Sequence, residues 1–317
     1  MKAAILQEPG KFEIETRDIP TPGHFQALIK TGVCGVCTSE LDMWTGDAKG
    51  LEYPRFIGHE VAGTVVEVGD GVTDITPGDR VAVFAEGRGY AEYITEDIDR
   101  LYVLQDDTPF DIALGEPIAC SVNGVTKLDP QFNDNIAIVG TGFMGLIMIQ
   151  LFKIRGAGKI IAIDTRDSML TLAKNCGATH MLNPTDQDVV SEVKNLTDGV
   201  GVDIGIEAAG KQVTLDTAAQ LVRMEGKLEI FGFHQGDPRN INLAHWNWMA
   251  FQIVNGHSRS SHIYMDGMNT GLQLLEAGKL EMDDLVTHRL PLTEINNAFR
   301  MATKKADDFV KSVIVFE

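Results

Sequence analysis

The sequence predicts an α/β fold in which a doubly wound parallel sheet is inserted into an all-β domain. Three observations support this prediction. The first hundred residues are short β-rich runs separated by turn signals. From about residue 117, apolar strands alternate with helical patterns, which is typical of a parallel sheet covered on both faces. The final run, "KSVIVFE", has no parallel partner in that alternation, so we assign it to the N-terminal domain.

The β-rich runs of the first domain are "FEIETRDIP", "FQALIKTGV", "HEVAGTVVEVG" and "DRVAVFA", with "PTPG", "GDG" and "TPGD" as turns. A helix follows in "PIACSVNGVTKL". The strands of the inserted domain are "NIAIVG", "KIIAID", "HMLN", "VDIGIEAAG", "KLEIFGF" and "FQIVNG", and helical patterns such as "FMGLIMIQLFKIRG" and "RDSMLTLAKNCG" separate them. We therefore predict a catalytic domain over residues 1–121, a dinucleotide-binding domain over 122–258 and a return to the first domain over 259–317, beginning with the helix "YMDGMNTGLQLLEAGKL".

Composition narrows the classes of partner. The 317 residues carry a formal net charge of −18, which repels nucleic acid and anionic lipid. No apolar run is long enough to span a membrane, and the first residues do not resemble a signal peptide. Four cysteines are too few for a disulfide framework in a chain of this length. We therefore expect a cytoplasmic protein that binds neither nucleic acid nor a membrane.

A glycine-rich loop follows the first strand of the inserted domain. In "IVGTGFMG", Gly140, Gly142 and Gly145 have the G-x-G-x-x-G spacing of a dinucleotide-binding turn, and Phe143 and Met144 lie between them. The next strand ends in Asp164, 19 residues after Gly145. An acidic residue there accepts hydrogen bonds from ribose hydroxyls and repels a 2′-phosphate, so NAD is favoured over NADP. Arg166 favours NADP instead, because an arginine at this place can hold a phosphate. For the glycine motif itself, the alternative interpretation is a turn that binds no ligand.

Two cysteines three residues apart, Cys34 and Cys37 in "GVCGVCTSELDMW", have several possible roles. The pair alone fits a disulfide, a redox switch, half of a structural zinc site or one arm of a catalytic metal site. Downstream, His59 and Glu60 are adjacent, and Glu116 opens "EPIACSV". Together with Cys37 they form a set of sulfur, nitrogen and oxygen donors that suits zinc, and the catalytic type of site uses three protein ligands.

These motifs resemble the zinc-dependent medium-chain alcohol and polyol dehydrogenases over almost the whole chain. The similar segments are "GVCTSELDMW", "GHEVAGTVVEVG", "PGDRVAV", "GYAEYI", "EPIACSVNGV", "VGTGFMG", "IEAAG" and "KSVIVFE". The resemblance implies a GroES-like β-barrel domain that carries the zinc site, and a Rossmann domain inserted into it. Glutamate followed by proline at Glu116 is similar to the sorbitol dehydrogenase branch.

The resemblance also implies roles for single residues. Cys37 and His59 match zinc ligands, Glu60 matches a ligand in some members, and Glu116 matches the third ligand position. Ser39 matches the hydroxyl that takes the proton of the substrate. Cys34 is then a packing neighbour of Cys37.

Three departures from the family pattern accompany these matches. The cluster of cysteines that holds a structural zinc is missing between Val83 and Glu92, so we expect one zinc per chain. Glu40 stands where an aspartate is usual. Asp42 replaces a relay histidine and becomes the candidate for the outer end of the proton relay.

The predicted function is hydride transfer between NAD(H) and a secondary alcohol or polyol, with zinc as Lewis acid. Two alternatives stand beside it: a zinc-free medium-chain NAD(P)H-dependent quinone or enoyl reductase, and a non-enzymatic NAD-binding redox sensor that uses Cys34 and Cys37. The resemblance further implies a homodimer or homotetramer paired near "FQIVNG". Candidates for lining the substrate cleft are Trp44, Phe84, His234, His257 and Arg259.

Overall fold

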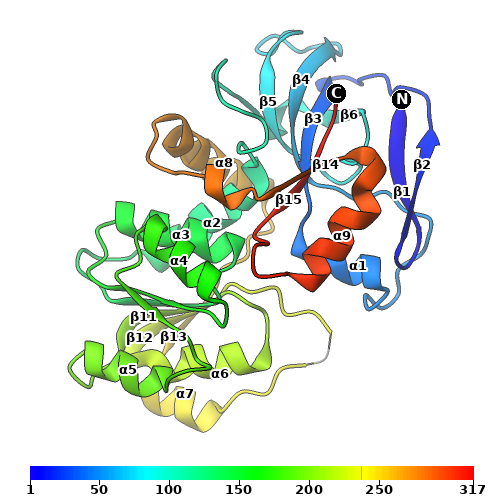
Figure 1. Cartoon of the computed structure of the whole chain (residues 1–317). Helices are drawn as coiled ribbons and strands as arrows, with labels where there is room; N and C mark the ends of the chain where they lie inside the picture. Colours follow the sequence, from blue (N-terminus) through cyan, green and yellow to red (C-terminus); the bar gives the residue numbers. More distant parts are fainter. Residues whose placement is uncertain (237) are drawn as a thin grey trace. The chain divides into compact units, whose positions relative to one another are not determined.

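A computed structural model describes residues 1–236 and 238–317 of the chain. The chain divides into two compact units (Figure 1). Unit 1 comprises Met1–Ala119 and Ser260–Glu317, and unit 2 comprises Cys120–Arg259. The second unit is therefore an insertion into the first, and each is described by itself below.

Unit 1 is built on a seven-stranded sheet in the described part of the chain, ordered β14-β15-β3-β4-β5-β7, with β6 paired to β3. A separate hairpin joins β1 and β2. The strands are β1 Lys2–Glu8, β2 Lys11–Thr16, β3 Gln26–Gly35, β4 Glu60–Val68, β5 Arg80–Phe84, β6 Tyr93–Asp97, β7 Leu101–Val103, β14 His288–Pro291 and β15 Ser312–Val315. The last strand pairs antiparallel with β3 and so lies in the sheet of unit 1.

The helices of unit 1 are α1 Leu41–Thr45, α8 Ser261–Glu276 and α9 Ile295–Lys304, with 3-10 turns at Thr38–Glu40, Ile98–Arg100, Asp283–Leu285 and Leu292–Glu294. In α9 the residues Ile295, Ala298, Phe299 and Ala302 are buried, at the spacing that puts them on one helix face. Phe299 packs against the rings of Phe12 and Trp44. We did not predict α9 from the sequence, although its apolar spacing is helical.

Unit 2 contains a six-stranded parallel sheet in its described residues, ordered β10-β9-β8-β11-β12-β13. Its strands are β8 Ile136–Val139, β9 Ile160–Ile163, β10 His180–Leu182, β11 Val202–Glu207, β12 Val222–Ile230 and β13 Gln252–Asn255. The helices are α2 Gly115–Leu128, which begins in unit 1, α3 Phe143–Ile154, α4 Asp167–Cys176, α5 Val189–Leu196, α6 Gln212–Leu221 and α7 Leu243–Met249. Numbered within the sheet, the order is 3-2-1-4-5-6, that of the Rossmann fold.

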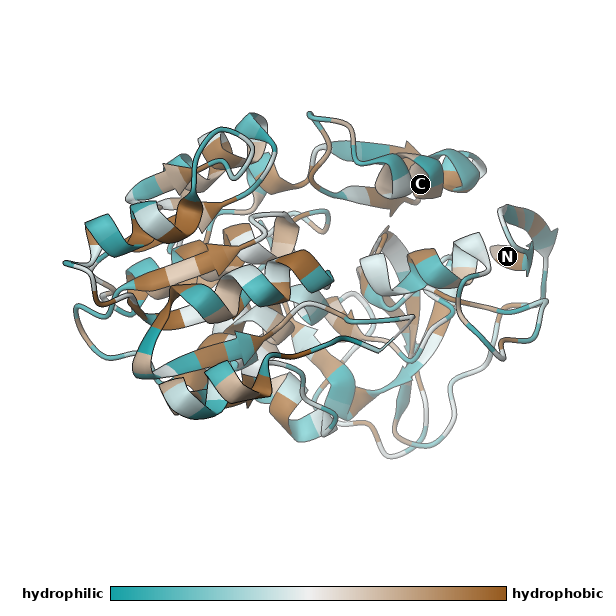
Figure 2. Ribbon diagram, turned by 90° about the horizontal axis from the view of Figure 1, so that it is seen from below, coloured by the Kyte–Doolittle hydropathy of each residue, from teal (hydrophilic) through white to brown (hydrophobic). Residues whose placement is uncertain are grey.

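Burial explains why the central strands are apolar without alternation. Every residue of β8 and β9 is buried, as expected when helices cover both faces of a parallel sheet. Figure 2 shows hydrophobic strands in the sheet and hydrophilic outer faces on several helices. No helix in residues 1–236 and 238–317 is long and apolar enough to cross a membrane.

Candidate metal centre and cofactor loop

Strand register assembles the candidate metal centre. In the antiparallel pair β3–β4, Gly35 at the end of β3 lies opposite Glu60 at the start of β4. Cys37 follows two residues after Gly35, and His59 directly precedes Glu60. Two segments that are about twenty residues apart in sequence therefore meet where one strand ends and the other begins.

Cys37, His59 and Glu60 offer ligand atoms that all lie within 4.8 Å of one another. Glu60 is buried, and Cys37 and His59 are half-buried. Thiolate, imidazole and carboxylate are the donors that zinc prefers, at about 2.0–2.3 Å from the ion. The three donors therefore fit a single zinc ion in type and spacing.

Glu40 orients the histidine. Its Oε1 lies 2.9 Å from Nδ1 of His59 and accepts a hydrogen bond of 2.7 Å from the amide of Gly58. Because Nδ1 donates to this carboxylate, Nε2 is left for a metal, which is the usual arrangement around zinc-bound histidines. Tyr90 donates to the other oxygen of Glu40 at 2.7 Å. The glutamate that departs from the family aspartate thus has both oxygens engaged, and Tyr90, which the sequence did not indicate, supports it.

Burial and charge shift the pKa values of Glu40 and His59 in opposite directions. Burial by itself raises the pKa of Glu40, but His59 and the hydrogen bonds from His59, Tyr90 and Gly58 lower it, and the net shift is downward. Burial lowers the pKa of His59, but Glu40 and Cys37 raise it well above its usual value. Glu40 and His59 therefore stabilise each other's charged forms. A zinc ion at Nε2 would compete with the proton on that nitrogen, and Nδ1 would keep its hydrogen bond to Glu40.

Lys311 is the main partner of Glu60. This lysine is only 5% exposed, and its ammonium lies 2.7 Å from Oε1 and 2.6 Å from Oε2 of Glu60. Only the contact with Oε1 has hydrogen-bond geometry, so Oε2 is a buried oxygen without a hydrogen bond. A Cβ on Gly35 would lie 1.9 Å from Oε2, so only glycine leaves room for this carboxylate. Lys311 comes from the C-terminal segment, and the sequence analysis did not single it out.

The other predicted residues of this site are placed differently. The Ser39 hydroxyl donates to the sulfur of Cys37 at 3.2 Å, beside the candidate ligands. Glu116 lies in the first turn of α2 and contributes to the negative surroundings that raise the pKa of Lys311. Asp42 lies in α1, and no hydrogen bond links its carboxylate to Ser39 or His59 among the described residues. The structure therefore brings Cys37, Ser39, His59 and Glu60 together and does not connect Asp42 to them.

None of the four cysteines, all of which lie in the described residues, forms a disulfide. Cys34 is fully buried and belongs to the hydrophobic core of unit 1. Burial, followed by the charges of Glu40 and Glu60, raises its pKa well above the usual value. An inert, protonated thiol results, because the thiolate is the reactive form.

The glycine loop of unit 2 lies at the carboxyl end of β8. Gly140 has φ +100°, and a Cβ on Gly145 would lie 2.4 Å from the carbonyl oxygen of Gly140. Nothing lies within 4 Å of the position that a Cβ on Gly142 would take. The first glycine thus makes the turn, the third allows close packing of strand and helix, and the second leaves open space at the start of α3. This is the arrangement that accepts a pyrophosphate.

Asp164 lies just after β9, next to this loop. Its carboxylate accepts hydrogen bonds from the amides of Thr141 and Arg166, both at 3.0 Å. The Arg166 guanidinium lies 3.5 Å from the same carboxylate. Phe143 and Met144 form the first turn of α3. The predicted cofactor-binding residues therefore lie together at the carboxyl ends of strands β8 and β9.

A second polar network orders the neighbouring loops of unit 2. Fully buried Glu207, at the end of β11, accepts hydrogen bonds from the amides of Ala209 and Gly210, and its other oxygen lies 2.7 Å from Nε2 of His234. Arg239 donates to Nδ1 of the same imidazole at 3.1 Å. An arginine cannot accept, so the proton must lie on Nε2. His234 is thus held between two loops by its own hydrogen bonds.

The other residues predicted to line a substrate cleft have varied surroundings. Trp44 is buried and stacks on Phe12 at 5.5 Å, which makes it a core residue and corrects that expectation. Phe84 stacks on Tyr264 at 4.5 Å within unit 1. His257 stacks on Phe231 in unit 2, and Arg259 is exposed.

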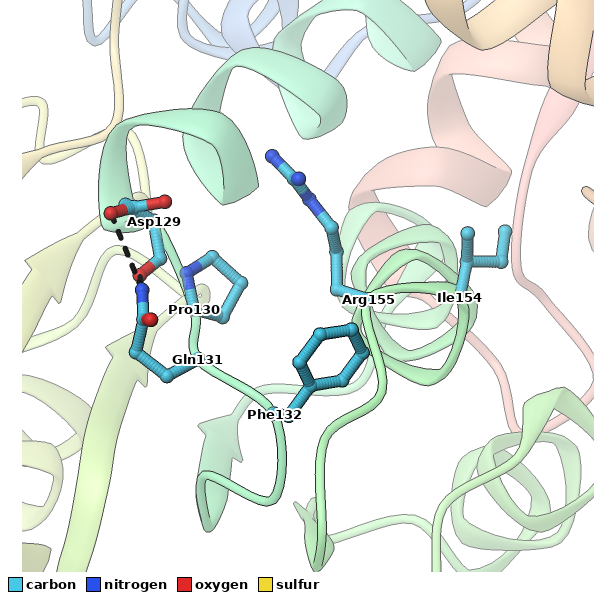
Figure 3. A pocket seen from close by; sticks show the side chains of 6 residues that line it. All are labelled: Asp129, Pro130, Gln131, Phe132, Ile154 and Arg155. Carbon is cyan, nitrogen blue, oxygen red and sulfur yellow. Dashed lines mark hydrogen bonds between the residues drawn. The ribbon is translucent and has the colours of Figure 1, made fainter.

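A surface hollow of about 350 Å³ lies elsewhere on unit 2 (Figure 3). It is lined by Asp129, Pro130, Gln131, Phe132, Ile154 and Arg155. These residues precede β8 and end α3, so they lie at the edge of the sheet opposite to the glycine loop. None of the predicted site residues lines this hollow.

Comparison with known proteins agrees with these observations. Residues 23–106 match the family model of the alcohol dehydrogenase GroES-like domain, and residues 144–272 match that of the zinc-binding dehydrogenases. Sorbitol dehydrogenase of Bacillus subtilis (strain 168) is 30% identical, and the alignment covers 99% of this chain and 97% of that protein. NADP-dependent isopropanol dehydrogenase of Thermoanaerobacter brockii is 28% identical, with 99% of each chain covered. The crystal structure of 2R,3R-butanediol dehydrogenase from Bacillus subtilis has a TM-score of 0.88 and 26% identity, and covers 100% of this chain and 99% of that one.

The sequence relatives, the family models and the fold all indicate the same protein family. The N-terminal unit has the matching GroES-like segment, and the inserted unit has the Rossmann strand order. With a relative 30% identical along nearly its whole length, the chain belongs to the zinc-dependent medium-chain alcohol and polyol dehydrogenases.

Proposed function

We propose that this dehydrogenase transfers a hydride between NAD(H) and the carbinol carbon of a secondary alcohol or polyol, with one zinc ion in the site of Cys37, His59 and a carboxylate. The observation that carries the proposal is the set of three donors within 4.8 Å, with His59 oriented by Glu40. Zinc supplies Lewis-acid chemistry at the substrate oxygen. The Ser39 hydroxyl, beside Cys37, takes the substrate proton.

The third ligand is a carboxylate, and two are available. Glu60 is supported by its distance to the other two donors and by its oxygen without a hydrogen bond. Its ion pair with Lys311 opposes ligation, because the ammonium already compensates the charge. Glu116 is the alternative. Zinc titration of Glu60→Ala and Glu116→Ala separates them, since the variant that lacks the true ligand loses more affinity.

A metal assay with paired cysteine variants tests the zinc site. We expect about one zinc per chain in the wild type, since within residues 1–236 and 238–317 no second cluster of three candidate ligands occurs. Cys37→Ser should lose most of the metal and lower turnover by at least about 10³-fold, as expected when several kcal/mol of Lewis-acid stabilisation is lost. Cys34→Ser is the matched control and should keep both. A wild type that is fully active without zinc would contradict the proposal in favour of the zinc-free reductase. A wild type that binds NAD(H) but neither holds zinc nor turns over any alcohol would favour the redox sensor.

The preference for NAD over NADP rests on Asp164 and Arg166. Arg166 is paired with the Asp164 carboxylate, which reduces its availability for a 2′-phosphate. One relative is NADP-dependent by name, so the coenzyme needs its own measurement. Asp164→Ser should weaken NAD binding and improve NADP binding, because the ribose acceptor and the repulsion of a phosphate are both removed. A wild type that prefers NADP would contradict this assignment.

The substrate class is supported by the relatives. Isopropanol and 2R,3R-butanediol are secondary alcohols and sorbitol is a polyol. A screen of NAD reduction over diols, sugar alcohols, cyclitols and hydroxy acids would identify the substrate.

Ser39→Ala should reduce turnover by about 10²–10³-fold with zinc still bound. Unchanged turnover and pH dependence in this variant would exclude Ser39 from the proton relay.

We also propose a homodimer or homotetramer that pairs through the edge of the parallel sheet, and a cytoplasmic location. β13 is the edge strand, and Ile253 on it is 51% exposed. Trp248, in the preceding helix α7, is 77% exposed. An edge strand beside exposed apolar side chains favours pairing with a second copy. Trp248→Glu should shift the mass in solution toward the monomer, whereas Phe132→Glu, at an exposed ring before the amino end of the central strand β8, should not. An unchanged mass in both variants would contradict this interface.

A further inference from the structure

Glu229 is a buried carboxyl group without a hydrogen-bond partner among the residues that the structure describes. It is the second-last residue of β12 and is 0% exposed. A Cβ on Gly124 of α2 or on Gly256 after β13 would lie 3.0 or 2.9 Å from its Oε1. The ring of Phe231 lies against the same two glycines. Neither carboxyl oxygen has a hydrogen bond. The group is therefore enclosed by backbone and an aromatic ring.

The charged groups around Glu229 are engaged elsewhere. Lys127 of α2 donates to the carbonyl oxygens of Asn255 and His257, and Lys227 of β12 donates to carbonyl oxygens at the end of α2. The pKa of His257 is lowered, mainly by burial, so this side chain is neutral. Burial raises the pKa of Glu229 to about 8, although Lys127 lowers it in part. At neutral pH the carboxyl group is therefore mostly protonated, but close to the pH at which it ionises.

The position of Glu229 places it on the nicotinamide side of the sheet. In a Rossmann sheet the cofactor crosses the carboxyl ends of the strands, and each half of the sheet takes one mononucleotide. The glycine loop and Asp164 belong to β8 and β9, which are the adenosine side. β11, β12 and β13 form the other half of the sheet (Figure 1). Glu229 is one residue from the end of β12, the middle strand of this half. Lys127 ties α2 to the residues that end β13.

We infer that Glu229 makes the choice between oxidised and reduced cofactor depend on pH, by losing its proton when NAD⁺ binds and keeping it when NADH binds. The nicotinamide ring carries a positive charge in NAD⁺ and none in NADH. A nearby carboxylate is favoured by the positive ring, and in buried surroundings such an interaction is screened less than in water. The step is proton release alone: the protein with a carboxylic acid plus NAD⁺ gives the complex with a carboxylate plus one proton. The inference rests on the proposed function, because NAD(H) must bind to this sheet.

Proton linkage predicts how strongly the affinity for NAD⁺ should depend on pH. Below the pH at which Glu229 ionises in the free enzyme, NAD⁺ affinity should rise by up to about tenfold per pH unit. NADH affinity should not follow this change. Above that pH, the difference in slope between the two cofactors should disappear. The carboxyl group therefore biases the enzyme toward NAD⁺ as the pH rises, which is the direction that favours alcohol oxidation.

Calorimetry with the zinc-loaded full chain tests the inference. Binding of NAD⁺ and of NADH is measured at pH 7 in two buffers with different heats of ionisation, which gives the number of protons released. We expect the wild type to release more protons with NAD⁺ than with NADH, and Glu229→Gln to reduce that excess. Protons released at the metal centre remain in both proteins and cancel in the comparison. Glu225→Gln, in an exposed position of the same strand, is the matched control and should resemble the wild type.

The outcomes separate this inference from the proposed function. If Glu229→Gln releases as many protons as the wild type, the inference is wrong although NAD(H) binds. If neither cofactor binds the wild type, the proposed function fails first. Should Glu229→Gln not fold, Glu229→Met offers a second side chain without a proton to lose, and circular dichroism verifies its fold. The inference then requires that this variant also lacks the excess.

Discussion

The metal centre of unit 1 and the α2-facing side of the sheet in unit 2 bury carboxyl groups in opposite ways. Glu40 and Glu60 have cationic partners, His59 and Lys311, at hydrogen-bond distance. Glu229 has none. The pKa of Glu40 is lowered, whereas that of Glu229 is raised to about 8, although burial alone raises both. Partners, and not burial as such, therefore decide whether an enclosed carboxyl group carries a charge.

The largest effect on stability should come from removing the ammonium group of Lys311, the cationic partner of Glu60 in unit 1. Lys311→Met leaves Glu60 buried without its partner, and breaking a buried ion pair in this way costs about 3–5 kcal/mol. We expect the zinc-free variant to unfold at a clearly lower denaturant concentration than the wild type. Saturating zinc should restore part of the loss, because the ion offers Glu60 a new partner. Equal stability of variant and wild type without zinc would show that the ion pair contributes little.

The next largest effect on stability concerns Glu229 in unit 2. Here the substitution should stabilise the fold, whereas Lys311→Met should destabilise it. The pKa of Glu229 is about 8 in the folded chain against an ordinary 4.5, so its stabilising contribution is complete below pH 4.5 and is lost as pH rises through 8. The full loss is several kcal/mol, roughly 5 at most. Glu229→Gln cannot ionise and should therefore gain stability relative to the wild type between pH 5 and 8. Denaturant unfolding at several pH values measures the difference. A constant difference across this range would mean that Glu229 does not titrate there.

A smaller effect should follow from loosening the support of His59. Tyr90→Phe removes the hydrogen bond to Glu40 but keeps the ring in the core. Outer contacts of this kind change metal affinity by about 10–100-fold, and the lower end applies here because Tyr90 acts through Glu40. Zinc competition with a chromophoric chelator measures the affinity. Tyr93→Phe, on the nearby strand β6, is the control and should bind zinc like the wild type.

The smallest effect is expected at Asp42. Its carboxylate is not hydrogen-bonded to the metal centre in the described residues, and burial followed by the charge of Asp47 raises its pKa. Asp42→Asn should change stability by less than about 0.5 kcal/mol and leave zinc binding unchanged, as is usual away from buried networks. If turnover falls as strongly as in Ser39→Ala, Asp42 does belong to the proton relay, and its position must change when substrate binds.

Much of the fold followed from local patterns in the sequence. Continuous apolar runs predicted the parallel strands, and the spacing of Gly140, Gly142 and Gly145 predicted a turn that the structure contains. The assignment of the final run to the N-terminal domain rested on its lack of a parallel partner, and the structure pairs that strand with β3. Helix α9 and strand β1 were not predicted. The apolar residues of α9 do have helical spacing, whereas the four apolar residues of β1 follow one another without the alternation typical of a strand.

The sequence by itself determined which donor types were present, namely the thiol of Cys37, the imidazole of His59 and the carboxylate of Glu60. Only the tertiary structure decided what surrounds them. Lys311 meets Glu60 from 251 residues away, and Tyr90 meets Glu40 from 50 residues away. Glu229 was unremarkable in "KLEIFGF" until the fold enclosed it beneath α2. The physical reason is that donor chemistry belongs to the residue, whereas burial and charge compensation depend on neighbours that strand register and helix packing bring from distant parts of the chain.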